Sequence, residues 1–328
     1  MNYNGGKWLN ACVHSLTEQS HENFECFIID NGSTDGSFEA LPQLDTRFVL
    51  MPQGENTGFA KGNNIAAKKA RGKWLALLNP DAFARPDWLE KLLKATTYRS
   101  DITMVGSTQY LADDPNHYDG VGDFYHIFGL AWRAAHKKKA HVKYPPMPAF
   151  GPCGAGALYH RETFIALGGF DERFFCYHED VDMAFRLRLM GGECIQSPDA
   201  VIDHVASGIS GRASAFALYY GTRNRIWTYF KNMPTPLLLL TLPAHLAVNL
   251  AYILWSCLRP KRLPPVIRGV VHGFAGLSNI WESRQKIQNT RHVSLMDLAR
   301  NFAYNPFKVL SRGVPRLSFP PQNDKKNS

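Results

Sequence analysis

Two carboxylates stand at points of the sequence where an apolar run gives way to turn residues. Asp30 follows the run Phe24–Ile29 and opens a polar, glycine-rich turn whose groups are suited to hydrogen-bonding a nucleoside. Asp81 follows the run Trp74–Leu78 and ends the segment Asn79-Pro80-Asp81, which offers a hard oxygen ligand for Mg²⁺ or Mn²⁺ carrying a diphosphate. Either segment alone is also compatible with an ordinary turn or a helix start. Their order and spacing favour one shared binding site.

The segments around these carboxylates alternate between helical and strand patterns. We predict helices over 7–19 and 62–70, and strands over 24–29, 47–51 and 74–78. Such alternation is typical of a parallel α/β sheet with helices on both faces, in which ligands bind at the carboxyl ends of the strands. Asp30 and Asp81 would therefore point into one crevice.

The composition excludes disordered and low-complexity classes of protein. The chain has 328 residues, of which 45% are hydrophobic and 20% charged, so it can bury a substantial core of one large or two smaller domains. Its six cysteines are scattered without a C-x-x-C pair, and its first ten residues contain no apolar run. We therefore expect a cytoplasmic protein with reduced thiols.

Beyond these patterns, the chain resembles the family 2 glycosyltransferases of the GT-A fold, specifically their rhamnosyltransferase-like branch. The resemblance covers about residues 3–230 and depends on several motifs in one order. These motifs are Tyr3-Asn4-Gly5-Gly6, Ile28–Ser37, Glu55–Asn64, Leu77–Asp81, Gly154–Ala157, Gly168–Glu172 and Phe174–Arg186. It implies a mixed, Rossmann-like α/β sheet with helices on both faces, in a catalytic domain over residues 1–205.

The resemblance also implies an activity. The enzyme would transfer a sugar, with inversion, from a nucleoside-diphosphate donor to an acceptor hydroxyl, and L-rhamnose on a thymidine nucleotide is the expectation for the branch. Asp30 would contact the nucleoside base, and Asp81 would bind a divalent cation, Mg or Mn, with the diphosphate. The neutral Asn79 stands where the family motif has its first carboxylate. The donor-binding residues implied are Tyr3, Asn4, Asp30, Asn31, Asn56, Gly58, Asn63, Asn79 and Asp81.

Inverting transfer also needs a base for the acceptor hydroxyl. We predict Asp180 for this role, with Glu179 beside it, because Asp180 opens the helical stretch 181–190 and the helix dipole would keep it ionised. Asp182 and Arg186 are spaced for an ion pair on a helix face. Asp182 as the functional acid is an alternative, and so is a simple capped surface helix for the whole cluster.

Four further features have a weaker signal. His204 is a candidate metal ligand, although a lone histidine is as often structural. Arg223 and Arg225 could hold a phosphate of the donor or of a lipid-linked acceptor, or form a basic helix face. The small residues 151–157 are interpreted as a floor that lets the acceptor approach, and the lysines 137–139 as part of a solvated loop.

Charge is unevenly distributed along the chain. Residues 1–204 hold 20 Lys and Arg against 25 Asp and Glu, whereas residues 205–328 hold 17 against 3. The basic C-terminal region, 206–328, also contains the apolar segment 237–258, which is close to the length needed to span a bilayer. An anionic membrane surface is therefore the expected partner, rather than nucleic acid. We favour a helix lying in the membrane interface over a spanning helix or a buried core helix.

One departure from the family pattern concerns its first strand. In the family an apolar strand precedes the Tyr-Asn pair, and here Met1 and Asn2 stand where that strand should end. We expect either a start codon upstream or a nucleotide pocket that lacks one edge. Two functions follow: a glycosyltransferase of cell-envelope glycan synthesis at the inner membrane face, or a non-catalytic membrane-associated subunit that keeps the fold.

Overall fold

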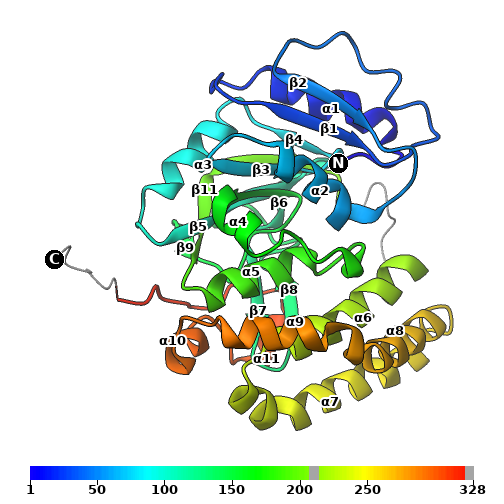
Figure 1. Ribbon diagram of the computed structural model, residues 1–328, viewed down its shortest axis with the longest axis vertical. Coiled ribbons are helices and arrows are strands. Elements are labelled where there is room, and N and C mark those ends of the chain that lie inside the picture. The colour runs from blue at the N-terminus through cyan, green and yellow to red at the C-terminus, as the bar shows by residue number, and fades with distance from the viewer. Residues whose placement is uncertain (207–213, 322–328) are drawn as a thin grey trace.

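The first 80 residues form the alternating helices and strands that the sequence predicts. The computed structural model describes residues 1–206 and 214–321, and its N-terminal part lies at one end of the molecule (Figure 1). The elements are α1 (Gly6–Thr17), β1 (Cys26–Asp30), β2 (Phe48–Pro52), α2 (Gly58–Lys69) and β3 (Trp74–Leu78). The third strand agrees residue for residue with the prediction, whereas α2 begins a turn earlier than expected, at Gly58.

A mixed sheet of seven strands forms the centre of the molecule. Its main path is β3-β10-β5-β11-β4, with β6 beside β5 and β9 beside β11. The long strands β5 and β11 run parallel, while β10 is antiparallel to both β3 and β5. The strands are β4 (Ala82–Ala84), β5 (Ile102–Leu111), β6 (Asp114–Gly120), β9 (Met147–Pro148), β10 (Gly156–His160) and β11 (Glu193–His204). The predicted mixed α/β sheet is confirmed.

Helices and a hairpin cover this sheet. The helices are α3 (Trp88–Thr96), α4 (Arg161–Ala166) and α5 (Glu179–Leu189), with a 3₁₀ turn at Glu172–Phe174. The strands β7 (Asp123–His126) and β8 (Leu130–Arg133) pair as a hairpin. Its Tyr125 ring packs against Phe150, Phe185 and Phe302, so residues from four distant segments share one aromatic core.

The C-terminal region is helical and gathers at the end of the molecule opposite β1 and β2 (Figure 1). Its elements are α6 (Ala215–Asn232), α7 (Thr235–Cys257), α8 (Leu263–Ala275), α9 (Leu277–Asn289), α10 (Leu295–Ala299) and α11 (Pro306–Leu310). The predicted apolar segment 237–258 lies almost entirely in α7. Among the described residues, α7 is the one helix long and apolar enough to cross a membrane.

A gap separates the β1–β2 pair from the central sheet. In the part of the chain that the structure describes, β1 pairs with β2 on one side and meets only Asn2 on the other. An apolar cavity of about 400 Å³ lies between β1 and β3, lined by Phe27, Ile29, Leu75 and Leu77 among others. The cavity therefore lies beside the edge of β1 that only Asn2 meets in the described residues.

We predict that an apolar extension will fill this space. Because Asn2 pairs with Asp30 in a parallel sense, residues added before Met1 would continue along β1 towards Cys26. Five added residues of the Val/Ile type should bury apolar area and raise the free energy of unfolding by about 2 kcal/mol or more. Thermal denaturation would measure this as a higher melting temperature. An extension of Gly and Ser of equal length is the control, and equal melting temperatures for both extensions would contradict the prediction.

Candidate active site

The carboxylate of Asp30, at the end of β1, anchors a turn built from two chain segments. Its Oδ1 accepts hydrogen bonds from the Asn2 amide (2.9 Å) and the Ser33 hydroxyl (2.6 Å), and its Oδ2 accepts one from the Ser33 backbone N–H. The Asn4 N–H donates to the Ser33 hydroxyl, and the Asn4 side chain accepts from the Thr34 N–H. The predicted donor residues Asn4 and Asp30 therefore lie together.

The neighbouring Asn31 joins this turn to the start of α2. It is fully buried, and its amide donates to Asn56 Oδ1 (3.0 Å) and to the Gly58 carbonyl (3.1 Å). Its own oxygen accepts from the Thr57 hydroxyl at 2.9 Å. Three of the predicted donor residues thus form one cluster, in which Asn31 positions the loop and has little surface left for a ligand. Tyr3 is partly exposed at 37%, next to this cluster.

The second predicted carboxylate, Asp81, faces His204. Both side chains are buried, and His204 Nε2 lies 3.4 Å from Asp81 Oδ1. The other ring nitrogen, Nδ1, lies 2.8 Å from Asp119 Oδ2 and donates to it. β4 and the end of β11 pair directly, which brings the two ends of the chain segment 81–204 together. Asn79 precedes Asp81, and its backbone N–H donates to the Ala155 carbonyl.

Asp119 sits at the centre of a charged network. It is fully buried, and it accepts hydrogen bonds from Arg133 and from His204, with the His136 ring 3.0 Å away. Although burial opposes ionisation, the Arg133 guanidinium and the two histidines hold the pKa of Asp119 far below its usual range. Asp119 is therefore a fixed negative charge that orients the His204 ring.

A strained turn leads into α5. Phe175, Tyr177 and His178 all have positive φ angles of 65° to 69°, a conformation that costs energy for residues with side chains. The fully buried side-chain amide of Asn224, on α6, compensates by donating to the carbonyls of Phe174 (2.9 Å), Cys176 (2.9 Å) and Tyr177 (2.7 Å). The C-terminal helices thus hold the turn from which the acidic cluster projects.

Gly58 lets α2 approach this same turn. Its φ is +87°, and a Cβ at this position would lie only 2.6 Å from the Phe175 ring. The Ala60 N–H also donates to the Phe175 carbonyl. The glycine is therefore needed for close packing between α2 and the turn that leads into α5. It is also one of the predicted donor-binding residues.

Asp180 occupies the first turn of α5 and faces a loop of small residues. Its Oδ2 accepts from the Gly154 N–H at 2.9 Å, and its Oδ1 from the Val181 N–H at 2.8 Å. Burial raises the pKa of Asp180, while these N–H groups and Arg133 oppose the shift. Burial also raises the pKa of Glu179 well above its usual range, and Glu179 Oε2 is buried without a hydrogen-bond partner. The two neighbouring acids thus have different environments.

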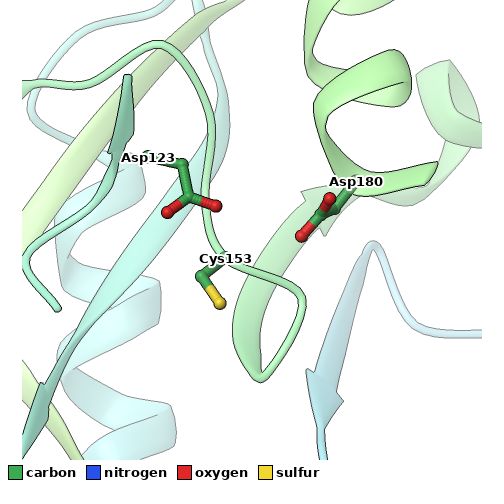
Figure 2. A group of neighbouring side chains, drawn as sticks. All are labelled: Asp123, Cys153 and Asp180. Carbon is green, nitrogen blue, oxygen red and sulfur yellow. The ribbon is translucent and has the colours of Figure 1, made fainter. Parts of the chain in front are cut away.

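Figure 2 shows Asp123, Cys153 and Asp180 converging from three separate segments, and their ligand atoms lie within 4.8 Å of one another. Burial raises the pKa of Asp123 to about 7. Arg133 lies between this group and the Asp119 network, because its guanidinium contacts Cys153 Sγ (2.7 Å) as well as Asp119. A series of neighbouring side chains therefore links the two predicted key carboxylates. Asp81, His204, Asp119, Arg133 and Cys153 follow one another through polar contacts, and Cys153 Sγ lies within 4.8 Å of the Asp180 carboxylate.

Asp182, the alternative acid, is fully engaged in a buried cluster. It pairs with Arg186 at 2.9 Å, as its spacing predicts, and also binds Lys231 (2.9 Å) and the Asn232 amide (2.8 Å). Its exposure is zero, so the pair lies inside the protein rather than on a helix surface. This arrangement gives Asp182 a structural role.

The two candidate phosphate-binding arginines have different surroundings. The Arg223 guanidinium, which is partly exposed, packs on Trp227 and donates to the carbonyls of Arg173 and Phe174. Arg225 is buried and donates to Asn249 of α7 at 2.7 Å. Asn63 lies within α2, and its side-chain amide donates to the Phe59 carbonyl of the same helix. The lysines 137–139 are exposed in a turn, as expected.

Sequence reasoning missed four residues that build the site: Asp119, Asp123, Arg133 and Asn224. Three of them come from 112–148, which gives no family motif, and their charges meet only because β6, β7 and β8 fold onto β5 and β11. The closely spaced acids of the Asp119-Gly-Val-Gly-Asp123 segment, beside aromatic residues, were the available signal.

This chain is similar to known glycosyltransferases. Residues 1–168 match the family described as Glycosyl transferase family 2. The N-acetylglucosaminyl-diphospho-decaprenol L-rhamnosyltransferase of Mycobacterium tuberculosis (strain ATCC 25618 / H37Rv) is 28% identical over 238 residues, which are 65% of this chain and 76% of that protein. The O-antigen biosynthesis protein RfbC of Myxococcus xanthus is 30% identical over 224 residues, 63% of this chain and 17% of that protein.

A solved structure shares the fold. The mannosyltransferase PcManGT from Pyrobaculum calidifontis, in complex with GDP-Man and Mn²⁺, superimposes with a TM-score of 0.50 at 18% identity, covering 88% of this chain and 81% of that one. The predicted resemblance to rhamnosyltransferase-like enzymes is confirmed by the relatives, and the predicted GT-A type of α/β fold by the likeness of the structures. Because the family match spans more than half of the 328 residues, this chain belongs to glycosyl transferase family 2.

Proposed function

We propose that this enzyme transfers a sugar from a nucleoside-diphosphate donor to a hydroxyl of a lipid-linked acceptor, with inversion at the anomeric carbon. The observation that carries the proposal is the contact series that joins Asp81 and His204 at one end to Asp180 at the other. This series supports the proposal that Asp81 and His204 hold the leaving diphosphate through a cation and that Asp180 receives the proton of the attacking hydroxyl.

Asp81 and His204 fit a divalent cation, Mg²⁺ or Mn²⁺. His204 Nδ1–H donates to Asp119, and Nε2 lies 3.4 Å from Asp81 Oδ1. Although burial opposes protonation, the two carboxylates raise the pKa of His204, so this position favours a positive charge between the ring and Asp81. A divalent cation bound there would replace the proton on Nε2 and take Nε2 and the Asp81 carboxylate as ligands. Oxygen and imidazole ligands suit Mn²⁺. When bound, the cation supplies charge stabilisation for the departing diphosphate. The related PcManGT was solved with Mn²⁺.

Asp180 is proposed as the base. Its carboxylate takes the proton of the acceptor hydroxyl while that oxygen bonds to the anomeric carbon and the bond from this carbon to the diphosphate breaks. The Gly154 and Val181 N–H groups fix the orientation of Asp180, and its raised pKa makes it a stronger proton acceptor once ionised. Asp30, held by Asn2 and Ser33, is proposed to contact the nucleoside base.

The relatives support a proposal for the acceptor and for the location. A relative that acts on N-acetylglucosaminyl-diphospho-decaprenol uses a lipid-linked sugar and transfers L-rhamnose, and another takes part in O-antigen biosynthesis. We therefore propose L-rhamnose as the donor sugar, a polyprenyl-diphosphate glycan as the acceptor, and a place on the cytoplasmic face of the membrane. Arg223, the more accessible of the two arginines, is the better candidate for a phosphate contact.

A donor screen tests this function. The enzyme is incubated with a panel of nucleotide sugars, a polyprenyl-diphosphate sugar and Mn²⁺ or Mg²⁺, and release of nucleoside diphosphate is measured. Acceptor-dependent release from one donor supports the proposal. If no nucleoside diphosphate binds by calorimetry in the presence of metal, a non-catalytic subunit becomes the better explanation.

Asp180→Asn is expected to lower kcat by about 10²–10⁴-fold while nucleotide affinity stays within twofold, because the amide keeps the shape of the side chain but cannot accept the proton. Steady-state kinetics and calorimetry provide the two measurements. Asp113→Asn, an exposed acid, is the matched control. Full activity of Asp180→Asn would move the base to another group.

The pH dependence of the rate follows from the raised pKa of Asp180. A base works only when ionised, so kcat/KM should fall as the pH drops through this pKa, which lies above the ordinary value of about 3.9. The acid limb of a pH–rate profile measures it. In Asp180→Asn the residual rate should lose this limb, and an unchanged limb would assign the titration to another residue.

Asp119→Asn should weaken Mn²⁺ binding by roughly 10–100-fold, because an amide no longer fixes the His204 ring for its ligand role. Calorimetric titration of Mn²⁺ in the presence of nucleoside diphosphate measures the effect without turnover. Asp203→Asn is the matched control, since Asp203 adjoins His204 in sequence but pairs with Arg85. Asp81→Ala should weaken binding at least as much, and unchanged affinity in both variants would refute the site.

A further inference from the structure

Helix α7 presents a continuous row of large apolar side chains to solvent. Leu246, Leu250 and Leu254 are four positions apart, as one helix face requires. The exposed large apolar residues of the helix are Leu239, Leu240, Leu246, Leu250, Leu254, Trp255 and Leu258. Leu240 and Leu258 are 75% and 79% exposed. In Figure 1 the helix forms the outer edge of the C-terminal region, at the end of the molecule farthest from β1 and β2.

The opposite face of α7 is polar and buried. It carries Thr241, His245, Asn249 and Ser256, which are all almost inaccessible. The His245 ring stacks on Tyr229 with the centroids 3.9 Å apart, and its Nδ1 donates to the carbonyl of Phe128. Asn249 accepts from Arg225. The helix is thus inverted relative to an ordinary surface helix, with polar groups inside and leucines outside.

This inversion argues against a spanning helix even though α7 has sufficient length. The 23-residue helix is long enough to cross a bilayer. To cross it, however, α7 would have to leave Tyr229, Phe128 and Arg225, and its polar face would enter hydrocarbon without these partners. With those contacts kept, only the leucine face is available to a membrane.

Charge identifies the surface that this face would meet. The sequence has no Asp or Glu between Asp203 and Glu282, and four cations cluster where α7 ends and α8 begins: Arg259, Lys261, Arg262 and Arg268. The guanidinium groups of Arg259 and Arg262 lie over the Trp255 ring. An aromatic ring beside cations is typical of the headgroup level of a bilayer. A second copy of this chain would bring like charges together, so anionic lipid is the better complement.

We propose that α7, with the exposed Ile267 and Val271 of α8, lies in the plane of the membrane interface, leucines in the acyl region and the Arg259–Arg268 cluster on anionic headgroups. The inference deepens the proposed function, because it gives the enzyme a defined orientation at the surface that carries a lipid-linked acceptor. Insertion is shallow, since the opposite face of α7 stays bound to the protein.

Flotation with lipid vesicles tests the surface. The full chain should bind vesicles of phosphatidylcholine with phosphatidylglycerol, bind pure phosphatidylcholine more weakly, and lose affinity as salt is added. Leu250→Glu combined with Leu254→Glu should lower binding by at least about tenfold. Leu310→Glu, at a leucine that is 81% exposed on α11, is the matched control and should bind normally. Arg259→Gln with Arg262→Gln should cost about fivefold per residue on the anionic vesicles.

Measuring how deeply labels at the two ends of α7 enter the bilayer distinguishes a helix that lies in the interface from one that spans the membrane. Cys257 is the exposed cysteine of the six, so a nitroxide or fluorophore can be attached there, and Leu239→Cys in a Cys257→Ser background provides the other end of α7. In the plane, both labels should lie at similar depths in vesicles. A spanning helix would separate them by about 27 Å along the membrane normal, and this result would overturn the proposal.

Two other outcomes would also overturn it: no binding to either vesicle, or a lipid-free dimer in analytical ultracentrifugation that Leu250→Glu with Leu254→Glu dissociates. Transfer to acceptor dispersed in detergent is measured on the same variants. It should stay unchanged in the leucine variants, because Leu250 and Leu254 are exposed and lie on the face of α7 opposite His245 and Asn249, which contact the rest of the protein. Loss of vesicle binding with intact transfer thus rejects only the membrane face, whereas absent transfer with intact vesicle binding rejects only the proposed function.

Discussion

The site depends on a buried charge cluster that joins α5 to α6. Asp182 has no solvent exposure and binds Arg186 of its own helix together with Lys231 and Asn232 of α6, while Lys231 also binds Asp171 at 2.6 Å. Such a cluster is costly to form, but removing one partner leaves an unpaired charge in the interior and typically costs about 3–5 kcal/mol. The direction of α5, and therefore of Asp180 at its start, is fixed by a helix of the C-terminal region. That region therefore supports the candidate site from inside the fold and is not a separate appendage.

Helix α6 also connects the candidate site to α7. On α6, Asn224 holds the strained turn before Asp180, and the adjacent Arg225 donates to Asn249 on the buried face of α7. Three left-handed residues in one short turn persist only where neighbouring groups compensate for their cost. Helix α7 is therefore linked, through Arg225 and the adjacent Asn224, to the turn that precedes the proposed base. An acceptor whose lipid tail stays in a bilayer would approach a site with a fixed orientation relative to that bilayer.

The local parts of this structure could be predicted from the sequence, and the long-range parts could not. The short apolar runs before Asp30 and Asp81 specify their own strands, and the strand 74–78 agrees with its prediction to the residue. The role of Asp119 depends instead on its contact with His204, which lies 85 residues later, and that of Arg133 on the hairpin that turns it back to Asp119. No periodicity carries this information. Likewise, the composition of α7 indicates an apolar helix, but only its contacts with Tyr229 and Phe128 tell which face is outside.

The cavity beside β1 connects stability with donor binding. Asn2 is the one residue that pairs with the open edge of β1 in the described chain, and its amide also binds the carboxylate of Asp30. A strand added before Met1 would continue directly into Asn2, because Asn2 pairs with Asp30 in a parallel sense. Such a strand would limit the motion of Asn2. The Asp30 turn would then be supported from the sheet as well as from Ser33. Filling the cavity should therefore reduce the ordering cost of nucleotide binding, because a turn that is already fixed loses less conformational entropy when a ligand binds.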